Sequence, residues 1–193
     1  MTHVVTITAD HHLDNWNRWA RRTDGNNSRL DAQIASIKHM LTYDAATKFT
    51  NRKLIIAGDS ANPRKETMPL CLSIALSDLA TWYNDNFEGT YVLPGNHDYP
   101  WLTPDRGKIS SIHGQGRPRV HVVAAPSIIQ HVMPDRYNKV SICMLPFQPT
   151  DEALSAAINS LIESAPKPRI LVGHQPLMEA ALDNNSISTE GFN

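Results

Sequence analysis

Four short apolar runs, each followed at once by polar residues that can bind a metal, constrain this chain more than any other feature. The runs cover residues 4–9, 54–57, 90–94 and 169–172, and each has the length and composition of a buried strand. The residues that follow them are, in chain order, Asp10-His11-His12, Gly58-Asp59, Gly95-Asn96-His97-Asp98 and Gly173-His174. Polar groups crowded at strand ends oppose folding when they have no partners. We therefore interpret them as ligands gathered along the edge of an α/β sheet.

Helical patterns lie between these runs. We expect an amphipathic helix of roughly five turns that begins at Ser28 as its N-cap, with Asp31 three residues further on. A second helix is expected after Asn62-Pro63, and a third is expected to begin at the cap Thr150. The core-facing stripe predicted for the second helix is Leu70, Ile74, Leu76 or Ser77, Leu79, Trp82 and Tyr83.

Strand and helix alternate along the chain, which indicates parallel pairing with right-handed crossovers. Two more apolar runs, residues 120–124 and 139–145, are predicted to be strands. A loop that contains Pro126 and Pro134 is expected to separate them. The predicted fold class is therefore α/β.

Composition narrows the class of protein. A chain of 193 residues with 41% hydrophobic residues is expected to form one globular domain, and a formal net charge of −1 argues against coating nucleic acid by bulk attraction. Cys71 and Cys143 lie in apolar segments and are expected to be buried free thiols. No apolar stretch reaches the roughly 18 residues that span a membrane, and no signal peptide is recognised. A cytoplasmic protein without a membrane partner is expected.

The residue types at the strand ends fit a pair of divalent metal ions. Asp10 and His12 are two residues apart, so in extended chain both can reach one ion. The carboxylate of Asp59 can bridge two ions, while Asn96 offers an amide oxygen and His174 an imidazole. Such a mixed set suits manganese, iron or zinc. Two ions about 3.5–4 Å apart clamp the attacking and leaving oxygens of an in-line phosphoryl displacement, and a water shared between them would lose a proton to become the nucleophile.

Two further histidines lie beside these ligands. His97 need not be a ligand itself, and it is placed to protonate the leaving oxygen or to steady developing charge. We therefore predict that His97 is catalytic. His11 is expected to point away from its neighbours, or else to touch the substrate.

These motifs resemble the calcineurin-like metallophosphoesterase superfamily, whose blocks are Asp-x-His, Gly-Asp, Gly-Asn-His-Asp/Glu, Gly-His and a final Gly-His-x-His. The first four blocks are present, and the likeness spans nearly the whole chain. Within the superfamily the chain looks most like the SbcD-type DNA exonuclease subunits, which work with an SMC-like ATPase. The segments that carry this closer likeness are Arg29–Asp31, Asn62-Pro63, residues 120–123 and Leu145–Phe147.

The resemblance implies a metallophosphoesterase-type β-sandwich flanked by helices, with the metals at the strand ends. The ligands that it implies are Asp10 and His12 for the first ion, Asp59 as the bridge, and Asn96 and His174 for the second. It further implies that His97 is the catalytic acid or stabilises the transition state. Manganese is the metal expected first, with iron or zinc as alternatives.

Two features depart from the family pattern. The third position after Asp59 is Asn62, where the phosphatases of the family carry Asp and the eukaryotic break-repair nucleases carry His. No Gly-His-x-His occurs, and Asn193 lies only 19 residues beyond His174. We expect residues 1–193 to be the N-terminal portion of a metallophosphoesterase domain that lacks its C-terminal strands and so leaves an exposed sheet edge. The alternatives are that a partner supplies the two missing ligands, or that the chain no longer catalyses.

Three classes of function remain open. The first is metal-dependent hydrolysis of phosphodiester bonds, with DNA as the expected substrate and an SMC-like ATPase as a partner. The second is hydrolysis of nucleotides, other small phosphoesters or phosphoproteins on the same scaffold, and the third is a non-catalytic domain that kept the fold. The residues predicted to contact substrate are His11, Arg18, Arg21 and Arg22, and a second basic loop covers residues 105–119.

Overall fold

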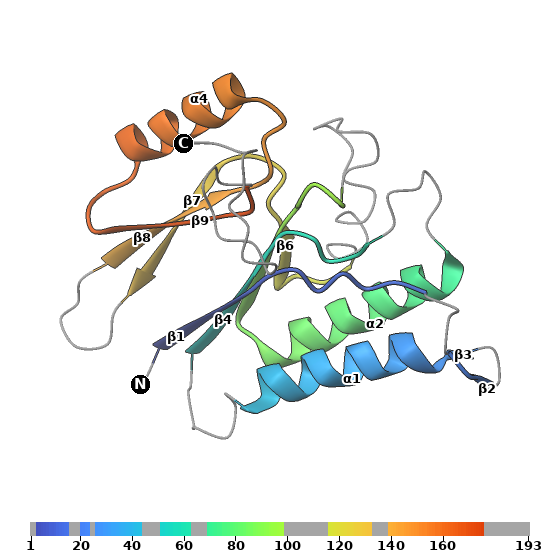
Figure 1. The fold of residues 1–193 in the computed structure, drawn as a ribbon. Coiled ribbons are helices and arrows are strands. Elements are labelled where there is room, and N and C mark those ends of the chain that lie inside the picture. The colour runs from blue at the N-terminus through green and yellow to red at the C-terminus, as the bar shows by residue number, and fades with distance from the viewer. Residues whose placement is uncertain are drawn as a thin grey trace, which may run out of the picture.

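The computed structural model describes residues 3–15, 20–23, 26–43, 51–62, 69–98, 116–132 and 139–175. The strands are β1 (His3–Thr8), β2 (Arg22–Thr23), β3 (Asn26–Asn27), β4 (Asn51–Ala57), β5 (Gly89–Leu93), β6 (Val120–Val122), β7 (Ser127–Val132), β8 (Lys139–Leu145) and β9 (Arg169–Gly173). The helices are α1 (Ser28–Tyr43), α2 (Leu70–Asn86) and α4 (Asp151–Ser164). Figure 1 shows their arrangement.

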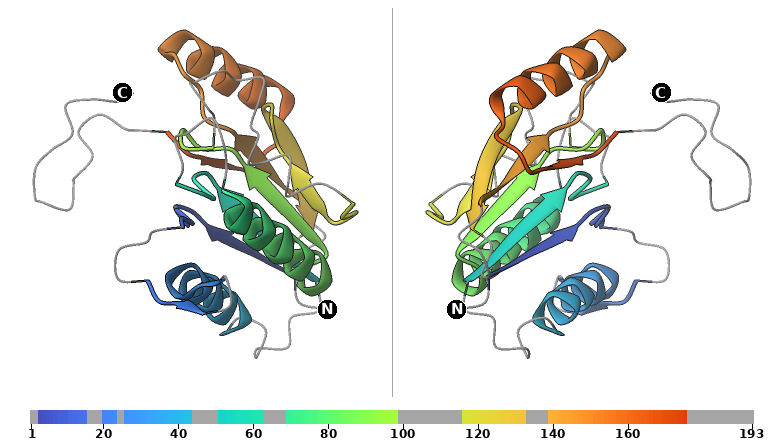
Figure 2. Two further views of the ribbon diagram at one scale, coloured as in Figure 1. Left: turned by 90° about the vertical axis from the view of Figure 1, so that its right-hand side faces the viewer. Right: turned by 90° about the vertical axis from the view of Figure 1, so that its left-hand side faces the viewer.

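The larger strands form two sheets. The first sheet has the order β1-β4-β5-β6, and every pairing in it is parallel, as the alternation of strand and helix predicts. In the second sheet, β7 pairs antiparallel with β8, and β8 pairs parallel with β9 after the chain has passed through α4. Helices α1 and α2 cover the outer face of the first sheet, and α4 covers the outer face of the second (Figure 2).

Three apolar clusters fill the spaces between these layers. Strand β4 shows the pattern: Leu54 and Ile56 face α1 and α2, whereas Ile55 and Ala57 face the second sheet. Because side chains alternate along a strand, a run that is apolar at every position belongs to a sheet that is buried on both faces. A third cluster lies between β8 and α4. The result is a helix–sheet–sheet–helix sandwich, which confirms the predicted α/β class.

The N-cap of α1 is Asn27, so the prediction of Ser28 is wrong. Oδ1 of Asn27 accepts hydrogen bonds from the backbone amides of Arg29 (3.0 Å) and Leu30 (3.3 Å), the amides that an N-cap normally satisfies. The hydroxyl of Ser28 instead accepts from the backbone amide of Arg21. Asn and Ser cap helices equally well, so the sequence could not choose between neighbours. The predicted cap of α4 is confirmed, because Oγ1 of Thr150 accepts from the amide of Ala153.

Two other local predictions are wrong. A loop was expected between the runs 120–124 and 139–145, but β7 lies there and begins directly after Pro126, which bounds the strand rather than interrupting it. In α2, Leu70 and Ile74 are exposed, while the predicted Leu76 and Leu79 are buried. The first two turns of α2 carry apolar residues on almost every side, so the spacing of these residues does not show which side of the helix is buried.

The outer strands leave apolar side chains uncovered. Among the described residues, β1 and β9 are each the last strand of their sheet, and Ile7 and Ile170 on these strands are both 50% exposed. Strands β6 and β7 are the other two end strands of the described sheets, and an open edge left by missing strands stays a prediction.

Both cysteines are free thiols, with Cys143 buried and Cys71 half-buried. Within the described ranges, no helix combines the length and the apolar character that crossing a bilayer requires.

Replacing Asn27 with Ala should lower the free energy of unfolding by about 1 kcal/mol, because the amides of Arg29 and Leu30 lose their acceptor. Urea unfolding followed by far-UV circular dichroism measures this change. Ser28→Ala is the matched control and should lower the free energy by less. A larger loss in Ser28→Ala than in Asn27→Ala would contradict the assignment of the cap.

Candidate metal centre

The four predicted strand ends come from both sheets. Strands β1, β4 and β5 are neighbours in the first sheet, but His174 follows β9 in the second. The expectation of one sheet edge is wrong in this respect, since the local pattern of a strand does not encode which sheet it joins. Packing of the two sheets still brings the ends together, because Nδ1 of His174 lies 3.1 Å from the carbonyl oxygen of Ala57 at the end of β4.

The loops after β1 and β4 run side by side beyond their strands. The hydrogen bonds between them include Asp10 N to Gly58 O (3.3 Å), His12 N to Asp59 O (2.9 Å) and Leu13 N to Ser60 O (3.2 Å). Asp10, His12 and Asp59 all have left-handed φ angles, of 56°, 43° and 47°. This conformation is uncommon outside glycine and persists where the surroundings enforce it, often at functional sites. The extended backbone expected at Asp10 and His12 is therefore absent, although their side chains do meet.

Two glycines allow the closest approaches in the site. A Cβ on Gly95 would lie 2.2 Å from Oδ1 of Asp59, and a Cβ on Gly58 would lie 2.3 Å from Cγ of His174. Gly58 also has a left-handed φ of 83°. Neither position can take a larger residue unless Asp59 or His174 moves.

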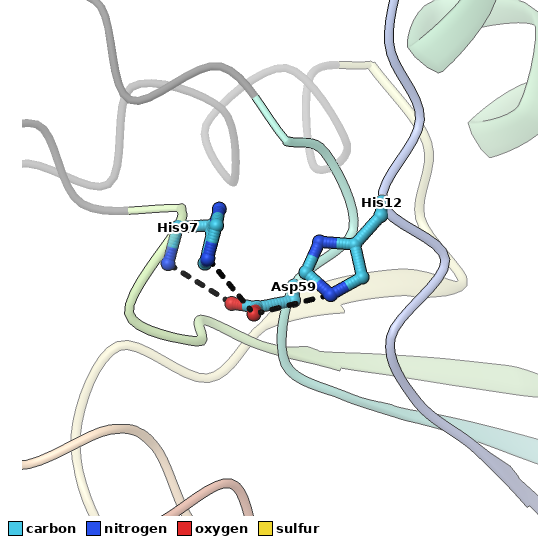
Figure 3. Close-up of side chains that lie close together, drawn as sticks. All are labelled: His12, Asp59 and His97. Carbon is cyan, nitrogen blue, oxygen red and sulfur yellow. Dashed lines mark hydrogen bonds and ion pairs between the residues drawn. The ribbon is translucent and has the colours of Figure 1, made fainter. Parts of the chain in front are cut away.

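The carboxylate of Asp59 is at the centre of the site. Its side chain is only 4% exposed, and Oδ1 accepts a 2.9 Å hydrogen bond from the backbone amide of His97. Oδ2 lies 3.3 Å from Nε2 of His174, 3.7 Å from Nε2 of His12 and 3.9 Å from Nε2 of His97. Figure 3 shows Asp59 between the rings of His12 and His97.

The other predicted ligands lie around this carboxylate. Oδ1 of Asp10 is 3.6 Å from Nε2 of His12, and Oδ1 of Asn96 is 3.2 Å from Nε2 of His174. The structure thus gathers Asp10, His12, Asp59, Asn96 and His174 in one place, together with His97. That these residues bind metal stays a prediction.

The site brings hydrogen-bond acceptors face to face. The carbonyl of Ala57 can only accept, so Nδ1 of His174 carries a hydrogen and Nε2 of the neutral ring is an acceptor. Nε2 nevertheless faces Oδ2 of Asp59 and Oδ1 of Asn96, which are acceptors as well. Such a meeting needs a positive species between the atoms, either a proton on Nε2 or a metal cation. These nitrogen and oxygen atoms could therefore act as ligands of a divalent cation.

The pKa shifts show the same need for positive charge. Burial lowers the pKa of His174, but the hydrogen bond to Asp59 and the charges of Asp59 and Asp10 outweigh it and raise this pKa overall. Burial raises the pKa of Asp59, but the hydrogen bonds from His174 and from the amide of His97 outweigh it and lower this pKa overall. Both shifts favour an anionic Asp59 beside a cation.

Two groups of side chains can each hold one ion. The first is His12, Asp59 and His97, and the second is Asp10, Asp59 and His174; within each group the ligand atoms lie within 4.8 Å of one another. Asp59 belongs to both, which fits its predicted role as a bridge. The first group includes His97, which is therefore a candidate ligand as well as the predicted catalytic residue.

Asp98 is a residue of the site for which the sequence patterns predict no role. It is fully buried, and its carboxylate accepts hydrogen bonds from the backbone amides of Gly95 (2.9 Å), Ser60 (3.3 Å) and Ala61 (3.3 Å). It therefore fastens the loop after β5 to the loop that carries Asp59. Its place in the Gly95–Asp98 motif was a signal, but only the fold shows which amides it reaches.

The predicted substrate contacts are described only in part. Arg18 and the side chain of Arg22 lie outside the described residues, and Arg21 is exposed. Burial lowers the pKa of His11 to about 4, so this ring is neutral at pH 7, and its Nε2 lies 3.0 Å from the hydroxyl of Thr8. In the second basic loop, the guanidinium of Arg117 binds α2 through Ser77 and Thr81. Arg117 is therefore committed to a structural contact.

In comparisons with known proteins, no protein-family model matches this chain and no curated protein matches it. What the fold and the site define together is an α/β protein with His and Asp groups that can hold a metal ion.

Replacing Gly95 with Ala should weaken Mn²⁺ binding by about 10-fold or more, because the new Cβ would push Oδ1 of Asp59 out of place. Isothermal titration calorimetry measures the affinity. Gly89→Ala, at the start of β5, is the matched control, since its Cβ would meet only the ring of Tyr91 at 3.4 Å. Equal Mn²⁺ affinities for the two variants would contradict the proposed position of the ion.

Asp98 should make stability depend on pH. Burial raises its pKa to about 7 from the ordinary value of 3.8. Between about pH 4 and pH 7 the unfolded chain has released this proton and the folded chain has kept it, so the contribution of Asp98 to stability falls as pH rises through this window. Asp98→Asn cannot titrate. The unfolding free energy of the wild type minus that of this variant, measured without metal, should therefore decrease from pH 4 to pH 7. A difference that stays constant over this range would show that Asp98 ionises normally.

Proposed function

We propose that this protein is a divalent-metal-dependent phosphoesterase of the calcineurin-like type, which hydrolyses phosphodiester bonds and takes DNA as its substrate. The observation that carries the proposal is the set of acceptor atoms around Asp59, supplied by four strand ends and requiring positive charge between them. The helix–sheet–sheet–helix layering, with the site at the strand ends, supports the metallophosphoesterase type of sandwich that the sequence motifs suggest.

The proposed ligand sets are those that the sequence resemblance implies, and the distances in the site are compatible with them. Asp10, His12 and Asp59 would hold one ion, and Asp59, Asn96 and His174 would hold the other. A pair of divalent ions would supply Lewis acidity for the phosphoryl oxygens and would lower the pKa of the attacking water. Manganese suits this mixture of carboxylate, amide and imidazole donors, and iron or zinc are the alternatives.

His97 is the proposed general acid. Its Nδ1 lies 3.3 Å from the carbonyl oxygen of Asn62, which leaves Nε2 on the side of Asp59. In this role Nε2 gives its proton to the leaving oxygen as the phosphorus–oxygen bond breaks, and solvent then protonates the ring again. An SMC-like ATPase as partner belongs to the same proposal and rests on the sequence resemblance alone.

The test offers Mn²⁺ with three substrates: linear DNA, a cyclic nucleotide and an aryl phosphodiester. We expect Mn²⁺-dependent cleavage of DNA, and a fall in kcat of about 10²–10⁴-fold in His97→Ala, because the leaving oxygen loses its proton donor. Asp59→Asn should abolish cleavage and weaken Mn²⁺ binding. His39→Ala, at an exposed histidine of α1, is the control and should cleave as the wild type does.

Turnover of only the small esters would move the substrate from DNA to nucleotides. Failure to hydrolyse any of the three esters with Mn²⁺, iron or zinc would contradict the proposal.

A further inference from the structure

A main-chain carbonyl contacts Nδ1 of the His97 ring, on the other side of the ring from Asp59. Nδ1 lies 3.3 Å from the carbonyl oxygen of Asn62. Because this oxygen can only accept, Nδ1 carries a hydrogen, and Nε2 is the nitrogen turned toward Oδ2 of Asp59 at 3.9 Å. The ring is 13% exposed, so water has little access to compete for these contacts. The direction of the ring therefore depends on where the carbonyl of Asn62 is fixed.

Asn62 is itself fixed at two more points by the loop that follows β1. Its backbone amide donates to the carbonyl oxygen of Leu13 at 2.9 Å, and its side-chain Nδ2 donates to Oδ2 of Asp14 at 3.0 Å. The carboxylate of Asp14 only accepts, which sets the orientation of the Asn62 amide. Leu13 is 1% exposed and forms a parallel bridge with Ala61, so this part of the loop is anchored in the core.

We propose that Asn62, fastened by Asp14, is a positioning residue for His97. The contacts run from Asp14 through Asn62 to His97 and so cross the loops after β1, β4 and β5. The effect on catalysis rests on the proposed function, but the effect on the ring does not. From the sequence, Asn62 is only a departure from the family pattern. The structure gives this residue a different way to act, through its main chain.

The contact with Asn62 leaves one ring nitrogen available. The carbonyl of Asn62 accepts from Nδ1, so Nε2 is the nitrogen directed at the site. Without this contact the ring can turn and offer the other nitrogen. Small misplacements of a catalytic group can lower a rate by about 10²-fold, so a contact that makes no bond to substrate still affects turnover.

Two substitutions at Asp14 separate the hydrogen bond from the charge. Asp14→Ala removes the acceptor of the Asn62 side chain, whereas Asp14→Asn keeps an amide oxygen in its place and removes the charge. Asn62→Ala breaks the same bond from the other side and leaves the main-chain carbonyl present. Asp85→Ala is the matched control, because Asp85 also accepts from a neighbouring asparagine, Asn84, on the exposed side of α2.

The first readout is the ¹⁵N spectrum of the His97 ring in metal-free protein, assigned with His97→Gln. At a pH at which the ring is neutral, we expect the wild type, Asp14→Asn and Asp85→Ala to carry its single hydrogen on Nδ1. Asp14→Ala and Asn62→Ala should show a mixture of both neutral forms. This measurement needs no substrate and no enzymatic activity.

The second readout is the rate of Mn²⁺-dependent hydrolysis of the best ester. We expect Asp14→Ala and Asn62→Ala to lower kcat by about 10-fold to 100-fold with KM changed by less than about twofold, and Asp14→Asn to keep the kcat of the wild type. A His97 ring that has lost its orientation lowers kcat, whereas unchanged substrate binding leaves KM nearly the same.

The outcomes separate this inference from the proposed function. Altered ring spectra without hydrolysis by any variant, wild type included, would support the positioning role and refute the proposed function. Wild-type spectra and wild-type kcat in Asp14→Ala would overturn the inference and leave the proposed function intact. Asp14→Asn behaving like Asp14→Ala would also overturn it, because the charge of Asp14 and not its bond to Asn62 would then be responsible.

Discussion

The rest of the site depends on one carboxylate, that of Asp59. Oδ1 accepts the backbone amide of His97 in the loop after β5, and Oδ2 faces three imidazole rings. The loop after β5 also contributes a carboxylate. Asp98 accepts hydrogen bonds from the backbone amides of Ser60 and Ala61, which directly follow Asp59. Each loop thus satisfies main-chain donors of the other with a buried side chain. A buried donor that loses its acceptor destabilises the fold, so neither loop can move without unpairing groups in both.

The backbone at the strand ends reflects the same constraint. Asp10, His12 and Asp59 adopt left-handed conformations that isolated chain disfavours. They are held there by amide–carbonyl bonds between the loops after β1 and β4 and by the close approach of Gly95 to Asp59. The stability needed to impose these conformations comes from elsewhere, from the apolar layers above and below β4. The core therefore supports an arrangement of ligands that local sequence preferences would not choose.

Much of this could be predicted from the sequence, and the exceptions have a common cause. The strands β4, β5, β8 and β9 and the cap at Thr150 were predictable, because continuous apolar runs and a single capping residue are local signals. The meeting of Asp10, Asp59 and Asn96 followed from parallel strands sharing one end of a sheet. The presence of β7, the place of β9 in the second sheet, the buried face of α2 and the contacts of Asp98 depend on which elements pack together. Composition and spacing do not carry that information, so these were wrong or missing.

The split of the site between two sheets has a consequence for how the protein folds. Asp59 comes from the first sheet and His174 from the second, so a partly folded chain with separated sheets holds only part of the ligand set. A cation that binds the full set of ligands more tightly than part of it would stabilise the folded state, in which the two sheets are packed together. It would stabilise partly folded states, in which the sheets are apart, to a smaller extent. With an ion held across both sheets, its release and the separation of the sheets would be thermodynamically linked events.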